Sequence, residues 1–141
     1  MANLSHLSEG EMKEILMLQE RLSLLDTQHK AKDSFMEYIR YIWPGFIEGD
    51  HHRIIAEKLT RVAKGELKRL IVNMPPRHTK SEFASIYFPS WVMGLNPDMK
   101  IMQTTHTADL SINFGRKVRN LMDSDEYSNI FSKVSLASDS K

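Results

Sequence analysis

The first 65 residues carry the period of amphipathic helices. Between residues 15 and 25, aliphatic side chains recur at steps of three and four, which places them on one face of a helix. Ser8 and Glu11 precede this run with the spacing of a capping box, in which each side chain binds a free backbone N–H. We therefore predict a first helix docked on its own domain, because two heptads are too few to indicate a coiled coil.

Two shorter helices are predicted next. Residues 34–43 carry an apolar and aromatic stripe, and Pro44 ends that segment because proline disfavours helical geometry before it. Asp50 is expected to cap a third helix, which ends at Gly65.

The pattern changes in the second half of the chain. Residues 70–74 are a short β-favouring run, typical of a strand buried on both faces. Helical patterning returns over residues 80–94, a second strand is predicted at 100–104, an amphipathic helix at 107–122 and a last short strand at 134–136. This alternation predicts an α/β fold, a parallel sheet with flanking helices, preceded by the N-terminal helices.

Composition narrows the classes of protein. The chain has 141 residues and a net charge of +1, so its overall charge gives no reason to expect nucleic-acid or membrane binding. The absence of cysteine excludes disulfides, thiolate metal sites and a cysteine nucleophile. No apolar run approaches the roughly 18 residues of a membrane helix, and no secretory signal pattern opens the chain, so we expect a cytosolic protein.

Candidate chemistry lies in the loop MPPRHTKS, between the first predicted strand and its helix. A phosphate-binding P-loop has the form G-x-x-x-x-G-K-[ST]; Lys80 and Ser81 match its end, whereas Met74 and Thr79 replace both glycines. At the start of a helix, Lys80 would neutralise β and γ phosphates and Ser81 would offer its hydroxyl to Mg²⁺. Thr79 is the awkward residue, because glycine normally allows unusual dihedrals there. The bare pattern also fits an ordinary strand-to-helix turn.

Three stretches resemble the large terminase subunits of tailed bacteriophages. MPPRHTKSEFASIYFPSW is similar to the deviant Walker A segment of that family, where PPRH-[GT]-KSE recurs and threonine is tolerated. WPGFIEGDHHRIIAEKLTRVAKGELKRLIVN resembles the segment before the loop, and KIMQTTHTADLSINFGRKVRNLMDSDEYSNIF resembles the family's second strand and following helix. Together these stretches cover roughly residues 35 to 137.

The resemblance implies an incomplete P-loop NTPase, the ATP-binding portion of the motor that packages viral DNA into proheads. Residues 1–48 would be a helical segment leading into the ATPase domain, and residues 49–141 the first part of its core. Arg77 and Lys80 would be catalytic, with Arg77 sensing or stabilising the γ-phosphate, and Ser81 would bind Mg²⁺. The implied cofactors are ATP and Mg²⁺, and the implied nucleotide-binding residues are Pro75, Pro76, Arg77, His78, Thr79, Lys80 and Ser81.

The resemblance also implies partners and a place in the cell. Double-stranded DNA would be bound mainly through the full-length protein, which also carries a nuclease domain. The portal protein, the small terminase subunit and further copies in a homo-oligomeric ring complete the implied partners, with no membrane among them. The expected location is the cytoplasm of the infected bacterial host, with transient docking on the prohead.

ATP hydrolysis in this class needs acidic residues that the chain does not supply in the expected place. No apolar strand after Lys80 ends in Asp or Glu; Asp109 falls in a helix pattern, and Asp123 and Asp125 fall in a polar turn. We therefore expect a fragment of a longer protein that hydrolyses little or no ATP alone.

Two assignments stay open at this stage. Phe46, His51 and His52 lie where such ATPases often form the adenine pocket, but the two histidines also fit a plain helix start. Arg116, Lys117 and Arg119 fit either a DNA-facing patch or the ordinary polar side of a helix. The alternative functions are another P-loop ATPase or helicase-like enzyme, and a non-catalytic assembly module.

Overall fold

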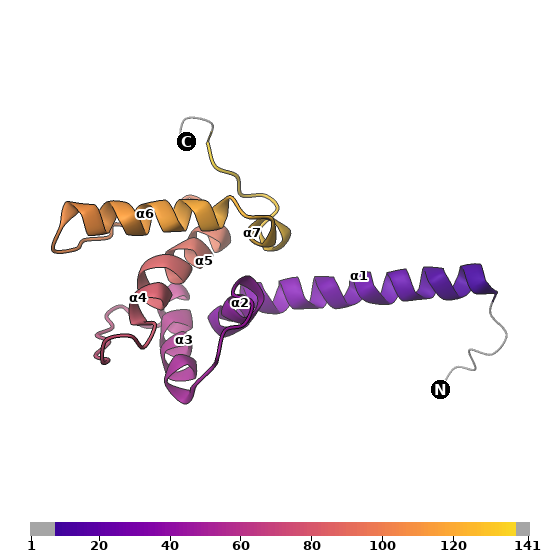
Figure 1. Cartoon of the computed structure of the whole chain (residues 1–141), viewed down its shortest axis with the longest axis horizontal. Helices are drawn as coiled ribbons and strands as arrows, with labels where there is room; N and C mark the ends of the chain where they lie inside the picture. The colour runs from indigo at the N-terminus through magenta and orange to yellow at the C-terminus, as the bar shows by residue number, and fades with distance from the viewer. Residues whose placement is uncertain (1–7, 138–141) are drawn as a thin grey trace.

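The structure is a computed structural model that describes residues 8–137, and within that range it contains helices and loops but no strand. A short π-helical turn, η2, joins α4 to α5 without a break, so one helical run extends from Lys80 to Leu95. The elements are α1 (Glu9–Asp33), α2 (Phe35–Ile42), α3 (Asp50–Ala63), α4 (Lys80–Glu82), η2 (Phe83–Tyr87), α5 (Phe88–Leu95), α6 (Ala108–Met122) and α7 (Asp125–Ile130) (Figure 1).

The predicted parallel sheet is wrong for the described residues. The segments 70–74, 100–104 and 134–136 form no ladder. In the first of them, alternate residues are half-buried and exposed, and Ile71 is 87% exposed, so one face packs on the core and the other has no cover. Met102 in the second segment is 90% exposed. A β-favouring run forms a strand only when a neighbour satisfies its backbone groups, and no described segment does so here.

The helix predictions hold better. Ser8 and Glu11 form the predicted capping box: Ser8 N–H donates to Glu11 Oε2 at 2.8 Å, and Glu11 N–H donates to Ser8 Oγ at 3.4 Å. Thr107 caps α6 by accepting from Leu110 N–H. The cap of α3 differs from the prediction, since Gly49 occupies that position and Asp50 is the first helical residue.

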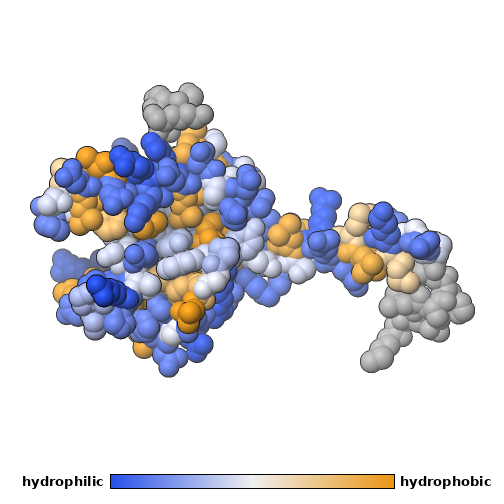
Figure 2. All heavy atoms as spheres, viewed as in Figure 1, coloured by the Kyte–Doolittle hydropathy of each residue, from blue (hydrophilic) through white to orange (hydrophobic). Residues whose placement is uncertain are grey.

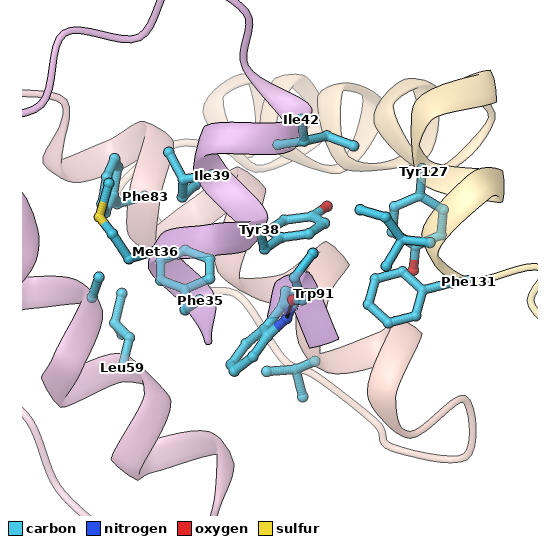
Figure 3. Packing of buried hydrophobic residues seen from close by; sticks show 14 of the residues in the cluster. Phe35, Met36, Tyr38, Ile39, Ile42, Leu59, Phe83, Trp91, Tyr127 and Phe131 are labelled. Carbon is cyan, nitrogen blue, oxygen red and sulfur yellow. Dashed lines mark hydrogen bonds between the residues drawn. The ribbon is translucent and has the colours of Figure 1, made fainter. Parts of the chain in front are cut away.

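The core gathers around α2, which contacts α1, α3, α5 and α7. Phe35 packs edge-on against Phe83 at a centroid distance of 5.7 Å and lies 5.4 Å from Trp91. Tyr38 lies 6.1 Å from Phe131 on the other side (Figure 3). Aromatic rings from four segments therefore close the interior without a sheet.

Ser90 ties this core together through hydrogen bonds. Its hydroxyl donates to Tyr87 O at 2.8 Å, which leaves it to accept from the Tyr38 hydroxyl, also at 2.8 Å. Tyr127 Oη donates to Ser90 O at 2.9 Å. Burial raises the pKa of both Tyr38 and Tyr127 far above the usual range, so both phenols stay neutral donors.

Most of α1 lies away from this core, contrary to the prediction that it docks on its own domain. In Figure 1 it extends from α2 as a single arm, and only Ala31, near its end, is buried. Figure 2 shows apolar side chains along the arm, interspersed with polar ones. The large apolar side chains of α1 that are exposed belong to Met12, Leu16, Met17, Leu18, Leu22, Leu24 and Leu25.

Gly94 and Gly115 provide a matched pair for testing the packing of α5 on the segment after α7. A Cβ at Gly94 would lie 2.5 Å from the ring of Phe131, whereas a Cβ at Gly115 would meet no atom within 4 Å. We expect Gly94→Ala to lower the free energy of unfolding by about 1–3 kcal/mol, the usual cost of overpacking. Gly115→Ala should raise it by up to about 1 kcal/mol through helix propensity. Urea denaturation measures both, and a stabilising Gly94→Ala would contradict this packing.

Candidate functional site

The predicted phosphate-binding segment forms a pocket of its own. Residues 74 to 82 line a cavity of about 470 Å³ between the end of the unpaired segment 70–74 and the start of α4. Its lining includes two cationic side chains, Arg77 and Lys80, and one anionic side chain, Glu82. All seven residues predicted to bind nucleotide, from Pro75 to Ser81, line this cavity.

The backbone of the loop is strained at two points. Arg77 has φ 67° and Thr79 has φ 57° with ψ 10°, and they are the non-glycine residues with positive φ in the described chain. The left-handed region costs of order 1–3 kcal/mol for such a residue, and most for a β-branched one such as threonine. Thr79 therefore adopts the conformation for which the P-loop pattern has glycine at this position.

Lys80 opens the helical run and turns back over the loop. Its Nζ donates to Met74 O at 3.5 Å, a long contact between two residues that line the cavity. The bond from Phe83 N–H to Thr79 O at 3.0 Å closes the first turn, so the N–H groups of Lys80 and Ser81 precede it. Such first-turn N–H groups have no intrahelical acceptor and attract anions.

The other loop side chains are mostly turned to solvent. Arg77, His78 and Ser81 are exposed, and His78 Nδ1 donates to Pro76 O at 2.9 Å. This bond closes the loop on itself over two residues. The arrangement leaves the Arg77 guanidinium and the Ser81 hydroxyl accessible to a ligand in the cavity.

His52, from the first turn of α3, is hydrogen-bonded at both ring nitrogens. Gly49 N–H donates to Nδ1 at 2.9 Å, and Nε2 lies 2.7 Å from Thr79 Oγ1. Because a backbone N–H can only donate, Nδ1 is the acceptor and Nε2 carries the proton. Nε2 therefore donates to Thr79 Oγ1, and the Thr79 hydroxyl in turn donates a hydrogen bond to His78 O at 2.7 Å.

The surroundings of His52 keep the ring neutral. The side chain is buried, with Phe83 stacked at a centroid distance of 5.2 Å. Burial lowers the pKa of His52 below its usual range, and nearby His51 and His78 add to this while Glu48 opposes it. A neutral ring is the form that the acceptor role of Nδ1 requires.

The three residues considered for adenine contact differ in their exposure and in their contacts. Phe46 packs on Trp43, His52 and Phe83, and His52 is used by the loop. His51 alone of the three is exposed, and it lines a largely apolar cavity of about 250 Å³. That cavity lies between α3 and the segment 70–74, and it shares Met74 with the loop cavity.

Glu48 anchors the start of α3 beside this site. Its carboxylate accepts from Arg40 Nε at 2.8 Å and Nη2 at 2.9 Å, and also from Arg53 Nε. The hydrogen bonds from Arg40, followed by those from Arg53, lower the pKa of Glu48 to about 2. The cluster joins α2 to the residue before Gly49, whose N–H orients His52.

We expect Glu48→Gln to lower the free energy of unfolding by about 1 kcal/mol at pH 7, a figure reduced because both arginines are largely exposed. The folded pKa lies below the unfolded value of 4.5, so this contribution is full above about pH 4.5 and fades as the pH falls toward 2. Urea denaturation at pH 7 and pH 3 measures the difference between the two proteins. Glu57→Gln, which removes an exposed partner of Lys58 on α3, is the control and should change little. A penalty that grows toward acid would contradict the assignment.

The remaining acidic residues do not join the loop. Asp109, Asp123 and Asp125 are exposed at the ends of α6 and the start of α7, and none of them lines the loop cavity. Within residues 8–137 no group of three or more His, Cys, Asp or Glu side chains is placed to hold a metal ion. The side-chain oxygens in the lining of the cavity belong to Thr79, Ser81 and Glu82, and that of Thr79 is used by His52 and His78. So small a set of oxygen ligands fits Mg²⁺ held mainly by phosphates and water.

Two features of the structure were not predicted from the sequence. The start of α7 was expected to be a polar turn, yet Ser124 caps it by accepting from Tyr127 N–H. The spacing of Tyr127, Ile130 and Phe131 after a serine was the available signal. The contact of His52 with Thr79 joins residues 27 positions apart, and no local pattern indicates it.

The surface of the described helices and the likeness of the chain to known proteins were also considered for evidence of function. Arg116 and Lys117 are exposed on α6, as either interpretation of that run requires. Among the described helices, none has the length and apolar character needed to cross a membrane. No protein-family model, curated protein or solved structure matches the chain.

Proposed function

We propose that the loop from Pro75 to Ser81 binds the phosphates of ATP with Mg²⁺. The observation that carries the proposal is that Arg77, Lys80 and the other first-turn residues of a helical run line one cavity, and that the residue before Lys80 is left-handed. An all-helical surround does not weaken this, because the attraction of phosphate depends on the local charges and N–H groups.

Three residues of the loop would contact the nucleotide or its metal ion. Lys80 exchanges its long contact with Met74 O for the β and γ phosphates, and Arg77 approaches the γ-phosphate from the exposed side. Ser81 offers its hydroxyl to Mg²⁺, which supplies charge neutralisation when bound. The base lies in the neighbouring apolar cavity, where His51 is the exposed ring.

The resemblance to large terminase subunits extends the proposal to the motor that packages viral DNA. On that basis the partners are double-stranded DNA, the portal protein, the small subunit and further copies of the chain in a ring, in the host cytoplasm and on the prohead. The described residues place no carboxylate beside the cavity except Glu82, which directly follows the Mg²⁺ ligand. This chain alone therefore turns over ATP no faster than its Lys80→Ala variant.

The test is a titration of the chain with a fluorescent ATP analogue and Mg²⁺, followed by competition with ATP, ADP and inorganic triphosphate. Competition that strengthens with the number of phosphates supports the loop assignment, because the proposed contacts are to the β and γ groups. His51→Ala should weaken ATP while leaving inorganic triphosphate unchanged. The absence of any saturable binding at millimolar ATP would refute the proposal.

A second candidate, an assembly module, is favoured by the exposed aliphatic residues of α1. The second copy of the chain is the partner that fits, since in a parallel pair with Leu18, Leu22 and Leu25 at the seam, Arg21 of one helix faces Asp26 of the other. Sedimentation measures this directly: self-association lost in a Leu18→Gln, Leu22→Gln double variant, with ATP binding intact, would support it. A monomer at high concentration would exclude it.

A further inference from the structure

His52 and Thr79, which are 27 positions apart in the sequence, are joined by a hydrogen bond between their side chains. The imidazole is 6% exposed, and both of its nitrogens are used: Nδ1 by Gly49 N–H and Nε2 by Thr79 Oγ1. The stacked ring of Phe83 and the edge of Phe46 hold it in place. The direction of hydrogen bonding therefore runs from the start of α3 into the loop.

Thr79 is the residue whose backbone sets the geometry of the phosphate loop. It precedes Lys80 directly, its carbonyl accepts the bond that closes the first helical turn, and its φ is 57°. A threonine released from its contacts would leave this conformation for the β or right-handed region. The two hydrogen bonds at Oγ1, from His52 and to His78 O, oppose that relaxation.

We propose that His52 is a positioning residue for the ATP loop: its neutral Nε2–H form fastens Thr79 in the left-handed conformation that glycine would adopt unaided. The inference rests on the proposed function in taking ATP as the ligand of the loop, whereas the contact between His52 and Thr79 does not depend on that function. It explains how a loop without glycine at this position keeps the shape that phosphate binding needs. It also assigns to His52 a role other than contact with the base.

The experiment is a double-mutant cycle on the full chain, with His52→Ala, Thr79→Gly and the combined variant. The fluorescent ATP analogue with Mg²⁺ is the probe. We expect His52→Ala to weaken binding at least tenfold, whereas the same change made in the Thr79→Gly background should weaken it by less than twofold. Glycine adopts positive φ without help, so it should make His52 dispensable.

A conservative variant separates positioning from packing. The amide of glutamine in His52→Gln can replace the Nε2–H donor, so it should bind the analogue within about threefold of the parent protein. Because burial lowers the pKa of His52 below its usual range, the parent should keep its affinity near neutral pH and lose it only at more acid pH, where the ring protonates and releases Gly49 N–H. His52→Gln should lose less, because an amide does not titrate; His51, His78 and Glu48, which lie near the same ring, are identical in the two proteins.

Equal losses from His52→Ala in both backgrounds would overturn the inference, because a purely structural histidine has no reason to couple to residue 79. A readout without nucleotide covers the case in which ATP does not bind. Trypsin cleaves after the exposed Arg77, and His52→Ala should speed that cleavage at least fivefold in the parent but not in Thr79→Gly. Cleavage that is insensitive to His52 would refute the positioning role even if the loop binds another ligand.

Discussion

Replacing Trp91 with alanine is expected to lower the free energy of unfolding by about 4 kcal/mol. Trp91 is 1% exposed and lies against Phe35 (Figure 3), with the ring of Phe88 at a centroid distance of 6.5 Å. Its Nε1 donates to the carbonyl of Ala31 at 2.8 Å, and Ala31 is fully buried. The substitution removes a large ring from a packed interior and leaves that carbonyl without its donor, so the cavity and hydrogen-bond costs combine.

The chain supplies its own control in its second tryptophan. Trp43 is only half-buried and stacks on Tyr87 at 5.2 Å, so Trp43→Ala should cost clearly less, about 1–2 kcal/mol. Trp91→Phe, which keeps most of the volume but not the N–H, should fall between the two. Urea denaturation followed by circular dichroism gives all three values. Similar costs for the two alanine variants would show that the end of α1 is not anchored through Trp91.

The helices could be predicted because their signals are local. The box of Ser8 and Glu11 needs only a spacing of three, and Thr107 stands directly before the periodic run that it caps. The stripe over residues 34–43 became the centre of the core because its aromatic positions face one side. Spacing along one segment contains all the information that such an element requires.

The strands could not be predicted because a strand depends on a partner. Leu70, Val72 and Met74 do pack on the core, and the alternation of exposure matches an extended chain with one covered face. Apolar period alone does not reveal whether a neighbouring backbone offers its N–H and C=O groups. Gln103, in the second of these segments, 100–104, has a buried side-chain Nε2 without a hydrogen-bond partner within the described residues.

In the candidate site, too, the local features could be predicted from the sequence and the contacts between distant segments could not. The motif predicts which residues line the cavity, because Pro75 to Ser81 are contiguous and fold onto themselves. What holds the loop in shape was not predictable, since the supporting residue is His52, which comes from α3. The departure of Thr79 from glycine was the clue that such a support is needed, but it does not identify the residue that provides it.

Lys80→Ala is expected to weaken the binding of ATP with Mg²⁺ about a hundredfold. Lys80 is a half-buried cation in the lining of the loop cavity, with its Nζ 3.5 Å from Met74 O. One or two charge-assisted hydrogen bonds to phosphate are worth roughly 1.5–3 kcal/mol each, and 1.4 kcal/mol corresponds to a tenfold change in Kd. Arg77→Ala should cost about tenfold, because Arg77 reaches the ligand from an exposed position where water competes.

Lys117→Ala provides the matched control, since it removes the same charge from the exposed surface of α6 and should change Kd by less than twofold. Salt then distinguishes a phosphate contact from a folding defect. A Coulombic contact in an open cavity is screened, so the penalty for Lys80→Ala should shrink as NaCl rises from 50 mM to about 0.5 M. A loss of binding that is independent of salt and accompanied by a lower unfolding midpoint would mean that Lys80 supports the loop rather than the ligand. Unchanged affinity in Lys80→Ala would remove the strongest reason for placing phosphate in this cavity.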